Sequence, residues 1–122
     1  MPTQPYFDLN TARATLAWLK PQLKKLKELG EKGGKAMAEF DLESADKYTL
    51  KIHKILSRIN KKGIDIRDQE ATLVDFPAVI NNMPAFFCWQ EGEEDIEYWH
   101  YAEDGFAGRT RITGTEQILS YL

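Results

Sequence analysis

Two reactive side chains, Cys88 and His100, lie in neighbouring aromatic-rich segments on either side of a short acidic stretch. If residues 91–95 form the connecting loop, antiparallel pairing sets Cys88 opposite Tyr98. The same register sets Phe86 opposite His100, because opposed residues then share a constant sum of residue numbers. Cys88 and His100 become diagonal neighbours on one face, where they can form a thiolate pair or provide two ligands for a metal such as Zn²⁺.

A carboxylate near this pair would complete a catalytic or metal-binding group, and Asp75 and Glu103 are the candidates. The candidate catalytic residues are His100, Cys88 and Asp75, with His100 as a general base or a ligand. The candidate metal ligands are Cys88, His100 and Glu103. With one cysteine and no C-x-x-C or H-E-x-x-H motif, the chain does not predict a closed structural zinc site. The alternative is structural, because a single cysteine is commonly a small buried hydrophobe and a strand histidine commonly hydrogen-bonds to backbone.

The segment Gly105-Phe106-Ala107-Gly108-Arg109 is a second candidate site, for an anion. Gly105 and Gly108 allow backbone N–H groups to converge on an anion, and Arg109 offers a planar fork for a carboxylate or phosphate. Arg111 adds a second positive charge in a half of the chain that is otherwise acidic. The alternative is an ion pair between Arg109 and a carboxylate, for which the candidates are Asp75, Glu103 and Asp104.

The first half of the chain must supply helices to support these segments. Asp8 is a natural N-cap before an apolar series with spacings of three and four residues, which predicts a helix over about 9–32. Pro21 should kink this helix because it removes one backbone hydrogen bond. Glycines at 30, 33 and 34 predict the tip of a hairpin.

A second helix is predicted from about Asp41 to Gly63, on a similar apolar series. The apolar stripes of the two helices suit antiparallel packing, but a hairpin alone buries little surface. The stripes therefore need the β unit or the hairpin of a second subunit, and we expect a dimer through the helices.

Beyond Gly63 the apolar period changes to two, which predicts strands. One pair is expected over 64–67 and 72–74, a break at 76–78, and a second pair over 85–90 and 96–101. Four aromatic residues should face the helices as core: Phe87, Trp89, Trp99 and Tyr101. We expect one α+β domain: a long antiparallel helical hairpin (about 8–62), a small antiparallel β-sheet (about 63–112), and a C-terminal tail or short helix (about 113–122).

Composition narrows the class of protein. The 122 residues are 43% hydrophobic and 29% charged, which suits a folded core, and no apolar run could span a bilayer. The N-terminus has no signal-peptide pattern and the single cysteine suits a reducing compartment, so we expect a cytoplasmic protein. Residues 1–62 carry a net charge of +6 and residues 63–122 carry −9. Nucleic acid is not expected as a partner, and no cofactor is expected.

Four ordered motifs carry a family resemblance: Leu73-Val74-Asp75-Phe76-Pro77, Phe87-Cys88-Trp89, Tyr98-Trp99-His100 and Gly105-Phe106-Ala107-Gly108-Arg109. The chain resembles the bacterial domain-of-unknown-function family numbered 2203, from Tyr6 to Arg109. It departs from that pattern at Tyr101 and Ala102, where an acidic residue commonly follows the Trp-His pair. The resemblance implies the order of hairpin and β region but no activity.

The paired helical stripes favour a small non-enzymatic interaction or scaffold protein that acts as a homodimer. The alternative is a metal- or anion-binding enzyme with a site built from Asp75, Cys88, His100 and Arg109. A third hypothesis makes residues 105–109 a site for a phosphate-bearing ligand without catalysis. The sequence does not identify the small-molecule ligand.

Overall fold

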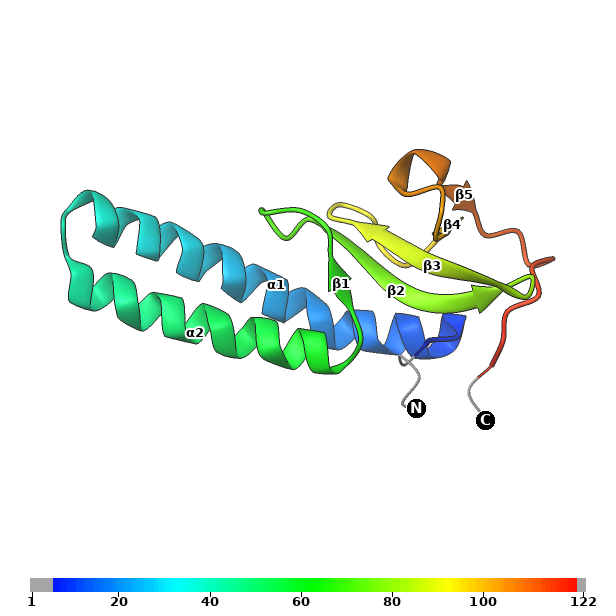
Figure 1. Ribbon diagram of the computed structural model, residues 1–122, viewed down its shortest axis with the longest axis horizontal. Helices are drawn as coiled ribbons and strands as arrows, with labels where there is room; N and C mark the ends of the chain where they lie inside the picture. Colours follow the sequence, from blue (N-terminus) through cyan, green and yellow to red (C-terminus); the bar gives the residue numbers. More distant parts are fainter. Residues whose placement is uncertain (1–5, 121–122) are drawn as a thin grey trace.

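The computed structural model describes residues 6–120. Two long helices, α1 (Leu9–Ala38) and α2 (Leu42–Lys61), form an antiparallel hairpin. A five-stranded antiparallel meander follows in the order β1-β2-β3-β4-β5, which confirms the α+β class. Its strands are β1 (Asp65–Ile66), β2 (Leu73–Ile80), β3 (Met83–Gln90), β4 (Tyr98–Tyr101) and β5 (Thr110–Arg111), with a 3-10 turn η1 (Phe106–Gly108) before β5. The sheet covers the N-terminal half of α1, and the distal half of the hairpin projects beyond it (Figure 1).

The cap of α1 is the predicted one, but its end is not. The Asp8 carboxylate accepts a 2.8 Å hydrogen bond from the Thr11 N–H, and the Thr11 hydroxyl accepts from the Asp8 N–H. The helix then continues through Pro21 and through the glycines at 30–34, so the predicted position of the hairpin tip was wrong. A Cβ at Gly33 would lie 3.7 Å from Tyr48 Cβ, an ordinary contact distance, so this part of α1 lies directly against α2.

The hairpin turns instead at Phe40, between the two helices. Phe40 has φ of 58°, and its side chain is 86% exposed. The Asp41 N–H donates to the Ala36 carbonyl at 2.8 Å, which closes the end of α1 as in a Schellman motif. Asp41 then caps α2 by accepting from the Ser44 N–H. The chain places an aromatic residue in a left-handed position that usually belongs to glycine.

Strand β2 runs through Pro77, where the sequence predicted a break, so that prediction was wrong. β1 pairs with β2 only at Asp75 and Val74, so Pro77 lies beyond the β1 pairing on this edge of β2. The Pro77 carbonyl accepts a 2.6 Å hydrogen bond from the Phe7 N–H, on the side away from β3. Proline is tolerated here because its missing N–H faces this side, which β1 does not reach, rather than the β2–β3 ladder.

The β2–β3 hairpin turns on Asn81 and Asn82, which have φ of 55° and 62°. Two central residues with positive φ are typical of the type I′ turn, which matches the twist of a two-residue hairpin. The short helix expected at 113–122 is absent from the described part of this tail, residues 113–120. The tail pairs with the end of β2 instead: the Leu119 N–H donates to the Val79 carbonyl, and Ile118 bridges to Ile80.

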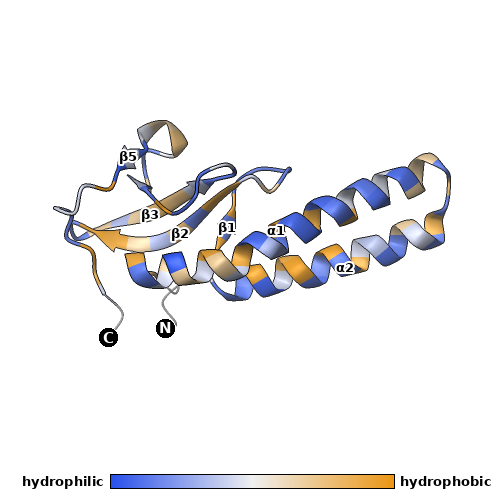
Figure 2. Ribbon diagram, turned by 180° about the vertical axis from the view of Figure 1, so that it is seen from behind, coloured by the Kyte–Doolittle hydropathy of each residue, from blue (hydrophilic) through white to orange (hydrophobic). Residues whose placement is uncertain are grey.

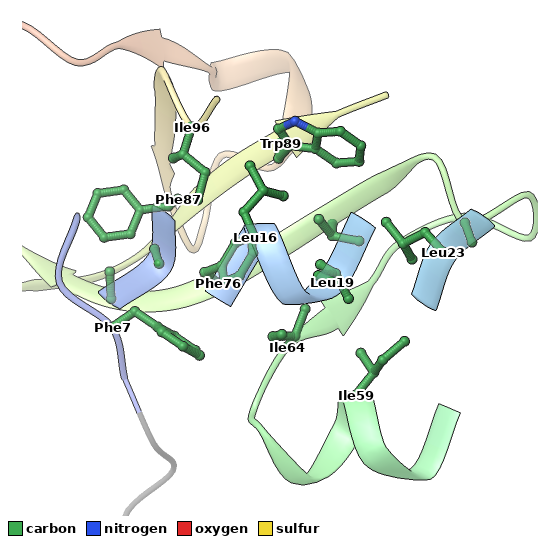
Figure 3. Close-up of a cluster of buried hydrophobic side chains, with 14 of the residues drawn as sticks. Phe7, Leu16, Leu19, Leu23, Ile59, Ile64, Phe76, Phe87, Trp89 and Ile96 are labelled. Carbon is green, nitrogen blue, oxygen red and sulfur yellow. The ribbon is translucent and has the colours of Figure 1, made fainter. Parts of the chain in front are cut away.

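The core lies between the sheet and α1, with the C-terminal end of α2 beneath (Figure 3). Phe76 from β2 and Phe87 from β3 are fully buried against Leu16 and Leu19 of α1. Trp89 and Trp99 belong to the same cluster and Tyr101 packs against it, which confirms the predicted aromatic face. Hydrophobic residues form stripes on both helices and dominate β2 (Figure 2). The helices thus cover one face of the sheet, and a site can form on the opposite face.

Candidate functional site

Three polar side chains gather on the sheet face that points away from the helices. Asp75 lies directly opposite Cys88 across β2 and β3. Cys88 lies opposite Tyr98, and Phe86 opposite His100, so the predicted register of β3 and β4 is confirmed. One ligand atom from each of Asp75, Cys88 and His100 lies within 4.8 Å of the others. We call these three residues the polar cluster.

The polar cluster is buried, with exposed fractions of 3%, 1% and 3% for Asp75, Cys88 and His100. A buried carboxylate and imidazole are costly unless they are paired or hydrogen-bonded. Their contacts therefore decide which chemistry the cluster can support.

His100 is held in a defined orientation by the backbone. Its Nδ1 lies 2.8 Å from the Tyr101 carbonyl oxygen, which can only accept, so Nδ1 carries the proton and donates. Its Nε2 then faces both carboxylate oxygens of Asp75, each at 3.2 Å. Carboxylate oxygens likewise only accept, so Nε2 needs either a proton to donate to Asp75 or a bound cation in that position, to which it would present its lone pair. Backbone fixation of the remote nitrogen is the usual arrangement for a metal-binding histidine.

Asp75 is also held from its other side, by Arg67. Arg67 Nε donates to Asp75 Oδ2 at 2.8 Å, and the guanidinium lies over the Phe86 ring with its carbon 4.8 Å from the centroid. The turn after β1 places Arg67, because the Asp68 carboxylate accepts from the N–H groups of Thr72 and Leu73 and closes the loop. The sequence alone indicated no role for Arg67. The signal it offered was an arginine on the same strand face as Asp65.

Cys88 carries a protonated thiol in this environment. Burial, reinforced by the Asp75 carboxylate, raises the pKa of the Cys88 thiol to about 12, and the Arg109 guanidinium opposes this rise. A cation bound in the cluster would reverse the balance, because a coordinating thiol loses its proton.

Arg109 lies beside Cys88 but is committed to another partner. Its Nη2 donates to both oxygens of Glu93, at 2.6 and 2.7 Å, and to the Cys88 carbonyl at 3.4 Å. Tyr98 and Phe106 sandwich the guanidinium, with the carbon 4.1 and 4.9 Å from the ring centroids. The expected ion pair of Arg109 thus exists, but with Glu93, which the sequence analysis did not name.

The other predicted residues lie outside the polar cluster. Arg111 donates to the Tyr98 hydroxyl at 3.2 Å, and Glu103 lies exposed in the turn after β4. A Cβ at Gly108 would lie 2.4 Å from Asp104 Cβ, so close packing of this turn accounts for the glycine. Gly105 has φ of 64° and lines the cavity described next.

A cavity of about 320 Å³ opens beside the polar cluster. The cluster and Arg67 form its polar wall, and the apolar wall consists of Leu73, Phe86, Ala102 and Phe106, with Gly105 at the edge. A ligand could therefore reach Asp75, Cys88 and His100 from this side. The site therefore has three side-chain ligand atoms close together and a cavity through which a ligand can reach them.

The donor set suits a borderline metal ion. Thiolate, imidazole and carboxylate together are ligands of Zn²⁺ and related divalent transition metals. In a tetrahedral site with bonds of about 2.0–2.3 Å, neighbouring ligand atoms lie roughly 3.3–3.8 Å apart. The 3.2 Å separation of His100 Nε2 from Asp75 is close to this range, and the Cys88 sulfur, within 4.8 Å of both, would move toward them on binding.

The fold and site define an α+β domain in which an antiparallel meander sits on a helical hairpin and carries an Asp-Cys-His cluster on its outer face. Residues 5–112 match the family model described as "Uncharacterized conserved protein (DUF2203)", so the chain belongs to this family. No curated protein and no solved structure matches the chain. Neither helix in residues 6–120 combines the length and apolar character needed to cross a membrane.

Proposed function

We propose that the protein binds a divalent transition-metal ion of the Zn²⁺ class through Asp75, Cys88 and His100. The observation that carries this proposal is the orientation of His100, whose Nδ1–H is held by the Tyr101 carbonyl while Nε2 converges with the carboxylate and the thiol. Three protein ligands leave one tetrahedral position open, and the cavity provides access to it. An open position is the arrangement of catalytic rather than structural zinc sites.

Charge balance supports a dication at this position. Asp75 contributes one negative charge, and Cys88 contributes a second once the metal has displaced its proton. Together they neutralise the metal, while His100 binds as the neutral imidazole. Arg67 remains on the outer oxygen of Asp75, in the role that hydrogen-bonded partners of metal-binding carboxylates commonly have.

The test is a titration of chelator-treated protein with Co²⁺ and Zn²⁺. Co²⁺ should give the near-ultraviolet band of a cobalt–thiolate bond, and one equivalent of Zn²⁺ should remove it. Cys88→Ser should abolish the band, and His100→Ala should weaken binding of both metals. The matched control is His53→Ala, since His53 is exposed on α2 and should leave both titrations unchanged. Absence of stoichiometric binding in the wild type would refute the metal site.

A second function, assembly into a homodimer through the hairpin, is supported by a different observation. The distal half of the hairpin extends beyond the sheet (Figure 1), and large apolar side chains there are exposed. They are Met37, Phe40, Leu42 and Leu50. A second copy of the same hairpin would cover them in a four-helix arrangement. This dimer would make the protein an interaction or scaffold protein, with or without a bound metal.

The charge difference between the basic first half and the acidic second half of the chain supports this dimer less than the exposed apolar residues of the hairpin do. Lys27 pairs with Glu91, and Lys20 donates to the Glu94 carbonyl at 2.7 Å. Arg13 lies 3.6 Å from Asp95. The basic helix and the acidic loop thus already attract each other within one chain, so part of this charge needs no external partner.

Native mass spectrometry of wild type and two leucine variants tests the dimer. Leu50→Glu places a charge on the projecting part of α2 and should shift the population to monomer. Leu119→Glu is the matched control, because Leu119 is half exposed on the tail beside the sheet. A wild-type protein that stays monomeric at high micromolar concentration would exclude the hairpin dimer.

A further inference from the structure

We propose that the cavity beside the polar cluster binds a small monocarboxylate with an apolar body, and that Arg67 recognises its carboxylate. The inference rests on the proposed metal function, because the second oxygen of the ligand would occupy the open metal position. Three features of the cavity support it: the unused donors of Arg67, the apolar walls, and the local charge.

Arg67 is held in place while part of its guanidinium stays unused. Its Nε is bound to Asp75 and its plane rests on Phe86, which fixes the fork. Within residues 6–120, neither terminal nitrogen of Arg67 donates a hydrogen bond, although Nη2 forms a longer ion pair with Asp65 at 3.6 Å. The side chain is 41% exposed and lines the cavity. Arg109, by contrast, is bound to Glu93 through Nη2 and is not among the residues that line the cavity. Arg67 is therefore the arginine that lines this cavity with terminal N–H groups able to donate to one carboxylate oxygen of a ligand.

The size and walls of the cavity define the rest of the ligand. A volume of about 320 Å³ lies at the lower end of the range for small-molecule pockets. At about 30 Å³ per water-sized group, it holds roughly ten non-hydrogen atoms. Phe86, Phe106 and Leu73 face this space, so the ligand gains from an apolar or aromatic body.

The net charge around the cavity favours a ligand with one carboxylate over a phosphate dianion. A dication with the Cys88 thiolate and the Asp75 carboxylate is neutral, which leaves the single positive charge of Arg67 at the cavity. Asp65 Oδ2 lies 3.6 Å from Arg67 Nη2 and offsets part of that charge, so a second negative charge on the ligand is disfavoured. A monoanion therefore fits better than the phosphate dianion, and the planar fork of arginine suits the planar carboxylate.

Benzoate, with nine non-hydrogen atoms, is the probe. Zinc-loaded protein labelled with ¹⁵N is titrated with sodium benzoate, and chemical shifts of the Phe86 and Phe106 amides report occupancy. Arg67→Gln should weaken benzoate binding roughly tenfold or more, as expected for a charged hydrogen bond. Arg67→Lys should also weaken it, because lysine keeps the charge but loses the fork. The control Arg58→Gln removes an exposed guanidinium from α2 and should leave the affinity unchanged.

Zinc binding is measured on the same samples, which separates the two proposals. Stoichiometric zinc with no saturable benzoate shifts would overturn the carboxylate site and leave the metal site intact. Benzoate binding that is unchanged in Arg67→Gln, or that is weaker than binding of inorganic phosphate, would also overturn it. Benzoate binding that depends on Arg67 in protein that takes up no zinc would support the carboxylate contact and refute the metal function.

Discussion

Asp75 contacts both Arg67 and His100, so its replacement is the most informative perturbation of the polar cluster. It accepts from Arg67 Nε at 2.8 Å and faces His100 Nε2 at 3.2 Å. Asp75→Asn keeps one oxygen for Arg67, and its amide N–H can donate to the Nε2 lone pair, since the Tyr101 carbonyl holds the proton on Nδ1. The loss is then one charge-assisted bond, about 1–2 kcal/mol.

Asp75→Ala removes both interactions and leaves Nε2 of His100 buried beside a small cavity. Removing one partner from a buried network costs about 3–5 kcal/mol, because the remaining group is desolvated without compensation. At about 2.1 cal/mol/K per residue, the unfolding entropy of this chain is about 0.26 kcal/mol/K. The expected fall in Tm is therefore about 4–8 °C for Asp75→Asn and about 12 °C or more for Asp75→Ala.

Thermal and urea unfolding in the presence of chelator, followed by tryptophan fluorescence and by circular dichroism, measure the differences in Tm and in free energy without a metal contribution. Asp46, exposed on α2, is the matched control, and its replacement by Asn or Ala should change the stability by less than about 0.5 kcal/mol. If Asp75→Ala destabilises the protein no more than Asp75→Asn, the coupling of Asp75 to His100 and Arg67 is absent and the reasoning fails.

Three further predictions concern the turns and the tail. Gly108→Ala should lower the free energy of unfolding by about 1–3 kcal/mol, because the new Cβ would lie 2.4 Å from Asp104 Cβ. Gly30→Ala has open space in α1 and should raise it by about 0.5–1 kcal/mol. Equal effects of the two substitutions in urea unfolding would contradict this. Glu116 accepts hydrogen bonds from backbone N–H groups of the tail turn, which outweigh partial burial and lower its pKa to about 2. Because folding lowers the pKa of Glu116, its contribution to stability is complete above the ordinary value of 4.5 and is lost as pH falls toward 2. The stabilities of wild type and Glu116→Gln should therefore converge between these pH values in acid unfolding curves. A difference that stays constant with pH would contradict this prediction. Phe40→Gly should relieve the strain of the left-handed backbone and stabilise the monomer by about 1 kcal/mol, as chemical denaturation would show. The same substitution removes an exposed aromatic side chain and should weaken any hairpin dimer, as native mass spectrometry would show.

Local patterns in the sequence determined a large part of the architecture. Helix α1 starts at its predicted cap, because the Asp8 carboxylate needs only the N–H groups of the next turn. The pairing of Cys88 with Tyr98 and of Phe86 with His100 followed from the position of one acidic loop, because a strand has a fixed period of two. The same period assigned Phe87 and Trp89 to the core face.

Tertiary structure decided the features that depend on partners distant in the sequence. Among the glycines at 30–34, which remain helical, Gly33 contacts Tyr48 of α2. Pro77 remains in a strand because β1 does not reach it and the Phe7 N–H bonds to that edge of β2. The pairing of Arg109 with Glu93 depends on how the turn at 105–109 folds over Tyr98. None of these contacts has a local signature, because each joins segments whose relative position is set only by the packed sheet.

The polar cluster illustrates both contributions. Sequence spacing brought Cys88 and His100 to one face, but it left Asp75 and Glu103 as equal candidates for the carboxylate. The register of β2 against β3 places Asp75 opposite Cys88, while Glu103 lies in an exposed turn. Arg67 joins them through the short pairing of β1 with β2. Residue types and period fixed which side chains share a face, and only the order and register of the strands decided which of them meet.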